Sequence, residues 1–316
     1  MKHRGILIAL GGNAISPEGE EGTIEQQFRH TAESMRAIVL ALHGRFSGVV
    51  ITHGNGPQVG NIVLRSELAA PALYPLPLDT CVSDSEGGMG YMIQQVLHNV
   101  LREAGSDADV VSVLTQTLVS REDPAWQNPV KYIGRFYTGD EARQLAVERG
   151  WKMREDPGRG WRRVVPSPAP VEIIELRAIR ALVESGAVVV AAGGGGIPVV
   201  RDSMGFLHGV EAVVDKDHAS ALLCAGLGIG TFVILTGVEH VMLNFRKPGE
   251  LVLKRVTVSE CEAYLADGQF PEGSMGPKIR SAIRFLRDGG SRAIITTAAN
   301  LASALEGKSG TEIVAG

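Results

Sequence analysis

The chain has little that would point to an oxidising compartment or a membrane. Only three of its 316 residues are cysteines (Cys81, Cys224 and Cys261), and this odd, widely spaced set favours free thiols over a disulfide framework. No apolar run approaches the length that spans a bilayer. A strand-like run begins at Ile6, which leaves no room for a signal peptide before it. We therefore expect a cytoplasmic protein with no membrane partner.

Signals for nucleic acid, zinc and the common nucleotide loops are also missing. The formal net charge of -4 gives no basic footprint for nucleic acid. The eight histidines are scattered without Cys/His ligand spacing, so we expect no metal site made of protein side chains. No Gly-x-x-x-x-Gly-Lys-Ser/Thr loop occurs, and the run from Gly54 to Gly56 is followed by Gly60, which misses the dinucleotide fingerprint. A Rossmann dehydrogenase is therefore disfavoured.

Apolar runs alternate with helical patterns along most of the chain. Strands are expected at Ile6–Leu10, Gly48–Thr52, Val110–Leu118, Ala187–Ala192, Thr231–Leu235 and Arg292–Thr296. Helices are expected at 28–42, 91–101 and 171–183. Strands that are apolar throughout are typical of a parallel sheet with both faces covered. We predict an α/β fold: one domain over residues 1–316, a three-layer α/β/α sandwich with a mainly parallel central sheet.

The segment 122–166 interrupts this alternation. It holds all three tryptophans (Trp126, Trp151 and Trp161), many of the lysines and arginines, and ends at Pro166. An aromatic cluster of this kind predicts a small protruding subdomain with its own core. A surface insertion without function would have the same pattern, but loops of this length are more often functional. We interpret the segment as a lid.

Three of the expected strands run into glycine-rich turns: Gly11-Gly12-Asn13, Gly54-Asn55-Gly56 and Gly193–Gly196. Ligands of parallel α/β sheets bind at the carboxyl ends of the strands. One glycine cluster could serve only a tight turn, whereas three together favour backbone N–H groups gathered round an anion.

Two lysines are expected at helix starts near the same edge. Lys216 lies in the run Val213–Ala219, with Asp217 expected at or near the N-cap, and Pro277 places Lys278 just inside another helix. Helix N-termini favour anions, and phosphoryl transfer depends on positioning and charge neutralisation. A capped helix with a solvated lysine would explain the first motif alone. The combination with the glycine turns favours phosphate chemistry.

These motifs closely resemble the carbamate kinase pattern, in collinear order and nearly from end to end. The matching blocks are Leu10–Ala14, His53–Gly60 (HGNGPQVG), Asn128–Tyr137, Val164–Pro168, Gly193–Pro198, Val213–Ala219 and Phe270–Ile279, which includes FPEGSMGPK. The resemblance implies an amino-acid-kinase fold, usually dimeric. It also implies the reaction of ATP with carbamate to give ADP and carbamoyl phosphate, with Mg²⁺, and in the cell the reverse direction that forms ATP.

The resemblance further implies roles for residues. Carbamate and the transferred phosphoryl group would be held by Gly11, Gly12, Asn13, Gly54, Asn55 and Gly56. The nucleotide would be bound by Asp215, Thr236, Gly237, Met275 and Gly276. The catalytic group would be Lys131, Lys216, Asp217 and Lys278. In that group Lys216 and Lys278 would neutralise phosphate charge, Asp217 would orient both, and Lys131 would reach in from the lid.

Two positions depart from the family pattern. Gly237 stands where members usually carry Asp, and Glu86 stands where Gln is usual, in an expected loop before the helix at 91–101. These departures leave two alternatives: a related kinase with another carboxylate or phosphate acceptor, or a non-catalytic nucleotide or anion binder. Carbamate itself needs no general base, because its attacking oxygen is already anionic. We therefore expect His53 to pack at its strand end rather than act as a base.

Overall fold

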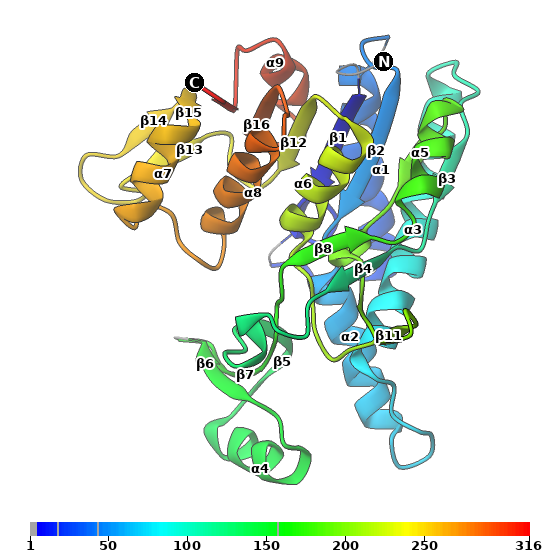
Figure 1. The fold of residues 1–316 in the computed structure, drawn as a ribbon, viewed down its shortest axis with the longest axis vertical. Coiled ribbons are helices and arrows are strands. Elements are labelled where there is room, and N and C mark those ends of the chain that lie inside the picture. The colour runs from blue at the N-terminus through cyan, green and yellow to red at the C-terminus, as the bar shows by residue number, and fades with distance from the viewer. Residues whose placement is uncertain (1–4, 18, 43, 157) are drawn as a thin grey trace.

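An eight-stranded sheet forms the centre of the computed structural model, which describes residues 5–17, 19–42, 44–156 and 158–316 (Figure 1). The strand order is β15-β17-β16-β12-β1-β2-β9-β3. The bounds are β1 Gly5–Leu10, β2 Gly48–His53, β3 Val110–Ser112, β9 Val188–Val190, β12 Thr231–Leu235, β15 Arg255–Thr257, β16 Arg292–Thr296 and β17 Thr311–Val314. Every neighbouring pair from β16 to β3 is parallel, while β17 runs antiparallel to β16. The mainly parallel sheet is confirmed.

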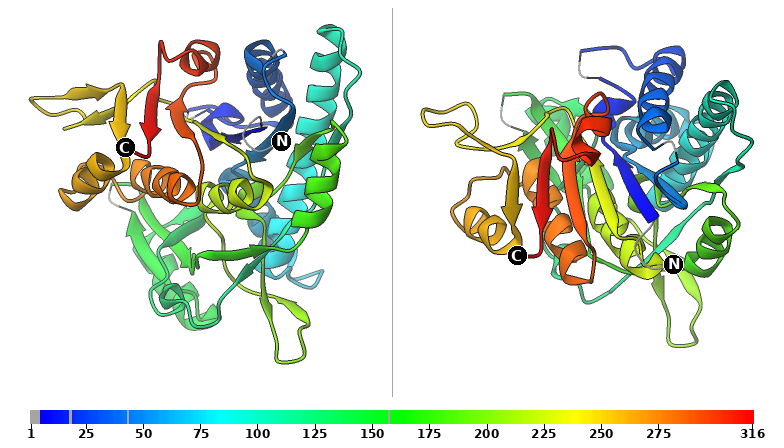
Figure 2. Two further views of the ribbon diagram at one scale, coloured as in Figure 1. Left: turned by 45° about the horizontal axis from the view of Figure 1, so that its top comes forward. Right: turned by 90° about the horizontal axis from the view of Figure 1, so that it is seen from above.

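Helices cover both faces of this sheet, as seen from above in Figure 2. One layer consists of α1 Ile24–Leu42, α3 Leu78–Glu103 and α9 Leu301–Leu305. The other consists of α5 Leu176–Glu184, α6 Lys216–Leu227, α7 Val258–Ala266 and α8 Met275–Arg287. Alternate residues of β1 point into the two cores, Leu7 into one and Ile8 into the other. This is the predicted three-layer sandwich.

The chain leaves the main sheet earlier than we expected. The run Val110–Leu118 is not one strand: β3 ends at Ser112, and β4 Gln116–Val119 belongs to a second sheet. That sheet has the order β11-β10-β4-β8, with β8 Pro170–Ile173, β10 Ile197–Arg201 and β11 Leu207–Gly209. The expected helix at 171–183 was also too long, because its first residues pair with β4 as β8. Periodicity over so short a run does not separate a strand from a helix.

Helix α3 is longer than the predicted 91–101. It begins at Leu78, so Glu86 is helical rather than in a loop. Consecutive glycines at 87 and 88 concealed the helix, since glycine disfavours helix interiors. Gly90 has a packing reason to be there, because a Cβ at that position would overlap the Ser112 hydroxyl of β3.

In the segment predicted as a lid, the part from Lys131 onward folds as a small antiparallel sheet with one helix, whereas Trp126 lies in a separate 3-10 turn and packs against the main core. The order is β5-β7-β6, with β5 Lys131–Tyr137, β6 Met153–Asp156 and β7 Gly160–Val165, and α4 Gly139–Arg149 lies beside it. The unit extends away from the central sheet (Figure 1). Tyr137 packs against Trp151, and the Arg163 guanidinium lies 4.7 Å from the Trp151 ring centroid. The unit packs on α2 Gly56–Ala69 through β5, and Arg163 of β7 also donates to Glu211 at 2.8 Å.

The remaining strands, β13 Val241–Leu243 and β14 Leu251–Leu253, form a hairpin between β12 and β15. Within the described ranges, no helix has the length and apolar character needed to cross a membrane.

Candidate active site

The turns after β1 and β2 are joined at the carboxyl edge of the sheet. The backbone carbonyl of Leu10, the last residue of β1, accepts a hydrogen bond from the Gly54 N–H at 3.1 Å. The Gly11 N–H donates to the carbonyl of Leu235, the last residue of β12, at 2.9 Å. A Cβ on Gly11 would lie only 2.7 Å from that same oxygen, so a larger residue would push the two strands apart. The first two predicted glycine turns therefore form one surface.

That surface carries unpaired donors. In the described part of the chain, the backbone N–H groups of Gly12, Asn55 and Gly56 have no intramolecular partner. Gly56 is also the first residue of the fourteen-residue helix α2, whose N-terminus carries a partial positive charge. A Cβ on Gly54 would be 3.6 Å from the Gly12 nitrogen, which shows how closely the turns approach. Asn13 follows Gly12 in a 3-10 turn, Gly12–Ala14. The surface formed by the turns after β1 and β2 therefore suits an anionic group.

The third glycine cluster contributes less to this surface than the prediction of three donor turns implies, because three of its four N–H groups have partners within the protein. Gly193–Gly196 are all buried. The Gly193 N–H donates to Glu86 Oε1 at 2.9 Å, the Gly195 N–H to the Ala192 carbonyl, and the Gly196 N–H to the Gly193 carbonyl. Among the described residues, the Gly194 N–H alone of these four has no partner. Glycine is required here because the neighbouring chain leaves no room for side chains.

Helix α6 places a lysine and an aspartate beside the glycine turns. Its N-cap is Asp215, two residues before the expected position, and Asp215 Oδ1 accepts from the Asp217 N–H at 2.9 Å. Lys216, the first helical residue, donates from Nζ to the Leu10 carbonyl at 3.0 Å. The Lys216 ammonium therefore lies where the turns after β1 and β2 meet.

Asp217 lies between two lysines from different helices. Its Oδ1 is 3.0 Å from Lys216 Nζ, and its Oδ2 accepts a hydrogen bond from Lys278 Nζ at 2.9 Å. Lys278 reaches this point because α8 packs along α6. From the third direction, Lys131 of β5 donates to Asp215 Oδ2 at 3.0 Å. The four residues predicted to be catalytic are thereby brought together, with Asp215 as a fifth member.

The charges of this cluster are set by mutual contact. Burial lowers the pKa of Lys216, against the pull of the Asp217 carboxylate. The same loss of water acts on Lys278, but Asp217 outweighs it and raises the pKa of Lys278. Burial would raise the pKa of Asp217, yet Lys216 and Lys278 together lower it. Burial likewise opposes ionisation of Asp215, and Lys131 reverses the effect, so the pKa of Asp215 is lowered. Three lysines against two aspartates leave an excess of one positive charge, which suits an anionic ligand.

His53 has the features of a packing residue. Its side chain is fully buried, its Nδ1 lies 3.3 Å from the Gly54 carbonyl oxygen, and burial lowers its pKa to about 4. At neutral pH it is therefore uncharged. Its Nε2 has no hydrogen-bond partner within the described residues and points at Gly193.

The residues predicted to bind the nucleotide lie at two places. Thr236 and the exposed Gly237 follow β12, and the Thr236 N–H donates to the Thr296 carbonyl at 2.8 Å. Met275 and Gly276 open α8, where Met275 packs on the core and the Gly276 N–H donates to the Pro271 carbonyl at 2.9 Å. Asp215 differs from these four, because its carboxylate is already engaged by Lys131 and by the helix start.

The sequence singled out Glu86 only as a departure from the family pattern and did not predict its buried position next to the site. Its side chain is 2% exposed, and burial raises its pKa to about 8. A signal for its burial was present, because Glu86 stands at helical spacing from the buried Val82, Met89 and Ile93. A carboxylate within such an apolar stripe indicates a buried polar contact.

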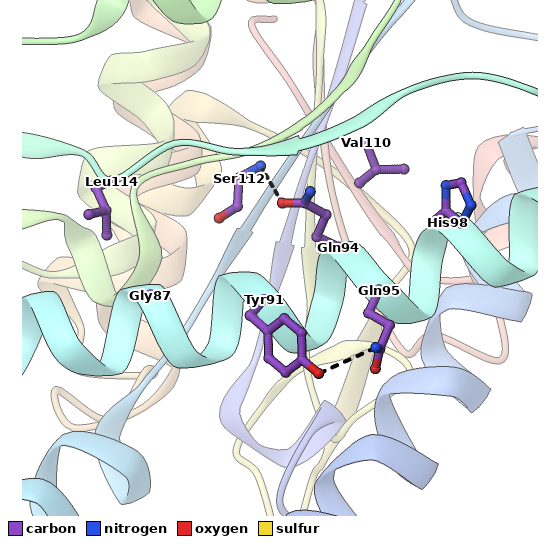
Figure 3. A pocket seen from close by; sticks show the side chains of 8 residues that line it. All are labelled: Gly87, Tyr91, Gln94, Gln95, His98, Val110, Ser112 and Leu114. Atoms are coloured by element: carbon purple, nitrogen blue, oxygen red, sulfur yellow. Dashed lines mark hydrogen bonds between the residues drawn. The ribbon is translucent and has the colours of Figure 1, made fainter.

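One pocket lies away from this site. It has a volume of about 420 Å³ between α3 and β3 (Figure 3) and contains none of the predicted site residues. Its lining consists of Gly87, Tyr91, Gln94, Gln95, His98, Val110, Ser112 and Leu114. We do not associate this pocket with the chemistry.

Comparison with known proteins agrees with this geometry. The family model of the amino acid kinase family matches residues 4–297. The chain is 46% identical over 311 residues to the carbamate kinase of Pyrococcus horikoshii, covering 98% of each chain. It is 43% identical over 315 residues to the carbamate kinase-like protein YahI of Escherichia coli, at 98% coverage of each. The structure of the Giardia lamblia carbamate kinase bound to AMP-PNP superposes with a TM-score of 0.93 at 41% identity, covering 99% of each chain.

Proposed function

Because the chain belongs to the amino acid kinase family, we propose that it is a carbamate kinase. It transfers a phosphoryl group reversibly between ATP and carbamate, giving ADP and carbamoyl phosphate, and in the cell it forms ATP from carbamoyl phosphate. Relatives of the same length and 46% identity carry that name. The observation that carries the proposal is the Lys216–Asp217–Lys278 arrangement beside the free N–H groups of the glycine turns.

In the proposed mechanism the protein positions charges rather than forming covalent bonds. The free N–H groups of Gly12, Asn55 and Gly56 hold the transferring phosphoryl group. Lys216, fixed at the Leu10 carbonyl, neutralises charge on that group, while Lys278 does so towards the nucleotide. Asp217 keeps the two ammonium groups apart and in place. These contacts accelerate transfer if they are stronger in the transition state than in the ground state.

No general base is needed, since the attacking oxygen of carbamate is anionic. This agrees with the environment of His53, which is uncharged, buried and separated from solvent.

A magnesium ion would accompany the nucleotide. Among the described residues, no group of three or more His, Cys, Asp or Glu side chains could hold a metal ion. The ion would therefore take its ligands mainly from nucleotide phosphate oxygens and water, which is common for Mg²⁺. Its contribution would be to neutralise phosphate charge and align the phosphates.

The unit formed by residues 122–166 is proposed to act as a lid that delivers Lys131. Closure would exclude water from carbamoyl phosphate and strengthen the charge contacts inside. Because Trp151 and Trp161 lie in this unit and only Trp126 packs against the main core, ADP with carbamoyl phosphate should change the intrinsic fluorescence. Lys131→Ala should reduce turnover far more than nucleotide affinity. If it instead abolishes ADP binding while turnover at saturating nucleotide is kept, Lys131 belongs to the nucleotide pocket and the lid proposal is wrong.

The decisive experiment is a coupled assay of ATP formation from ADP and carbamoyl phosphate by the purified chain. In the forward direction carbamate should be compared with acetylglutamate, aspartate and uridylate. Turnover with carbamate alone supports the proposal. Turnover only with another acceptor would identify a related kinase, and nucleotide binding without any turnover would identify a binding protein.

We also propose that the protein is a cytoplasmic homodimer, as its family membership implies. Light scattering coupled to size-exclusion chromatography would measure twice the 33.6 kDa chain mass if this is correct.

A further inference from the structure

The Glu86 carboxylate accepts two backbone hydrogen bonds, one of them from the buried loop Gly193–Gly196. Its Oε1 accepts the Gly193 N–H at 2.9 Å, and its Oε2 accepts the Thr115 N–H at 3.2 Å. No lysine, arginine or histidine nitrogen lies within 4.0 Å of this carboxylate in the part of the chain that the structure describes. A carboxylate that is 2% exposed without a cation is unusual, because an unpaired buried charge is costly.

The loop that Glu86 holds, Gly193–Gly196, touches both halves of the candidate site. A Cβ on Gly194 would overlap the Asn55 side chain, so the Asn55 amide rests directly on the loop backbone. A Cβ on Gly195 would overlap the carbonyl of Val214, the residue before the Asp215 cap. The loop Gly193–Gly196 therefore lies between the turn after β2 and the start of α6 and contacts both.

The same turn of α3 also holds Asn55 directly. Asn55 Nδ2 donates to Ser85 Oγ at 2.8 Å, and Ser85 Oγ donates to the Val82 carbonyl at 2.7 Å. A shift of the loop or of this turn of α3 would consequently move Asn55, whose backbone N–H is one of the free donors.

The partners of Glu86 are donors, so its two protonation states are not equivalent. An ionised carboxylate accepts both N–H groups, whereas a protonated one brings its own O–H to a place that needs an acceptor. Burial raises the pKa of Glu86 to about 8, although both N–H groups favour the ionised form. The titratable groups on the packed elements are His53 on β2, which is neutral, and Glu175 before α5, whose charge raises this pKa further. Lys216 and Asp217 on α6 are engaged with each other.

We propose that Glu86 is a positioning residue for the phosphoryl site, and that its proton decides whether the Gly193–Gly196 loop is held by one hydrogen bond or by two. With Glu86 ionised, the loop is fixed at both Gly193 and Thr115, and Asn55 is held in place. With Glu86 protonated, one of these bonds is lost and the loop loosens under Asn55. The site is therefore better formed at alkaline pH. This inference rests on the proposed function for its kinetic readout only.

The test compares pH profiles of the full-length wild type, Glu86→Gln and Glu103→Gln. Glutamine is nearly isosteric with glutamate but has one acceptor oxygen, so Glu86→Gln mimics the protonated state at every pH. Glu103 is the last residue of α3 and is 59% exposed, so Glu103→Gln controls for loss of a carboxylate on the same helix. The kcat/KM for carbamoyl phosphate with saturating ADP is measured from pH 6 to 9.5.

We expect the wild type and Glu103→Gln to gain roughly 3- to 10-fold in kcat/KM through an inflection near pH 8, as loss of one supporting hydrogen bond would cost. Glu86→Gln should change less than about twofold and resemble the wild type at low pH. If Glu86→Gln keeps the inflection, or if the wild type lacks it, the proposal is overturned.

A second readout separates this proposal from the proposed function. The affinity for inorganic phosphate, measured by calorimetry on the same three proteins, does not require turnover of carbamoyl phosphate. A phosphate affinity that rises with pH in the wild type but not in Glu86→Gln supports the role of Glu86 even if the chain acts on another acceptor. Parallel profiles in both proteins overturn it.

Discussion

Two carboxylates, Asp217 and Glu86, are almost equally buried, at 3% and 2% exposure, but their environments differ. Asp217 touches two ammonium groups, which overcome the cost of burial and lower its pKa. Glu86 has no cationic partner among the described residues; its partners are the Thr115 and Gly193 N–H groups and the Thr115 side chain, which do not overcome burial, and its pKa is raised to about 8. Burial alone therefore does not decide the charge of a group; the partners do. One carboxylate provides fixed charge for the site, and the other provides a group that can titrate.

The largest expected effect comes from removing one of the two lysines that contact Asp217. Lys216→Ala and Lys278→Ala should each lower turnover by on the order of 10²-fold or more, as loss of transition-state charge stabilisation does. Steady-state kinetics of ATP formation measure it. Lys308→Ala, at a position where the side chain is 74% exposed, serves as the control and should leave turnover unchanged. Near-normal turnover in either site variant would refute the assigned role.

Asp217→Asn removes the charge that distinguishes the two carboxylates and leaves two buried lysines uncompensated. We expect a loss of roughly 3 kcal/mol in the free energy of unfolding, the usual result of breaking a buried ion pair. Turnover per folded molecule should fall about tenfold or more, because the lysines are no longer oriented. Urea unfolding and kinetics on the same preparation measure both. Asp288→Asn, at the C-cap of α8 and 42% exposed, is the matched control. Lost stability with unchanged turnover would mean that Asp217 has only a structural role.

Whereas Asp217→Asn should destabilise the fold, Glu86→Gln should stabilise it. The raised pKa means that the folded chain keeps the Glu86 proton at pH values where the unfolded chain, with a value near 4.5, has lost it. The stability that the neutral group contributes is therefore complete below about pH 4.5 and is lost as the pH rises through about 8. Glutamine does not ionise, so the Glu86→Gln variant does not lose this stability as the pH rises. At pH 7 we expect a gain of about 3 kcal/mol, because the protonated wild type and the glutamine variant have the same number of these hydrogen bonds.

Melting temperatures of the wild type and Glu86→Gln between pH 5 and 9 would test that gain. The difference should widen up to about pH 8 and then level off. A constant difference across this range would show that Glu86 does not titrate there. Together with the kinetic test, the expected result is a wild type that becomes more active and less stable as the pH rises.

The smallest effect is expected at the three cysteines, which are buried groups whose pKa values are raised chiefly by burial. Burial raises the pKa of Cys81 to about 11 and of Cys261 to about 12, and raises that of Cys224 well above its usual value. Thiols in this state react slowly. Iodoacetamide at neutral pH should change turnover by less than about twofold, and mass spectrometry should find the folded chain unmodified. Rapid inactivation would show that one thiol is accessible.

The central part of the fold was predictable because its sequence pattern has one interpretation. Strands such as β1 and β12 are apolar throughout, and the structure places both within a residue of the predicted bounds. Helix α3 was predicted too short, because glycines at 87, 88 and 90 disfavour a helix unless tertiary packing requires them. The division of 110–118 between two sheets has no local signal, since it depends on pairing with strands distant in sequence.

The site was predictable where local chemistry defines it. Asp and Pro mark the helix starts that carry Lys216 and Lys278, and glycines mark the turns after β1 and β2. The contact between Lys278 and Asp217 spans 61 residues and follows only from the packing of α8 on α6. The internal pairing of three of the four N–H groups of Gly193–Gly196 was not predictable for the same reason. A glycine that exposes an N–H and a glycine that makes room for a neighbour have the same sequence signal.

The Leu10 carbonyl accepts from both the Gly54 N–H and the Lys216 ammonium. A carbonyl oxygen has two lone pairs, so the Leu10 oxygen can accept both hydrogen bonds at once. The order of assembly during folding follows from this, since Lys216 has no fixed position until β1 and β2 have paired in register. In a refolding experiment, catalytic activity should therefore return no earlier than the central strand pairing, and intermediates that contain only helices should be inactive.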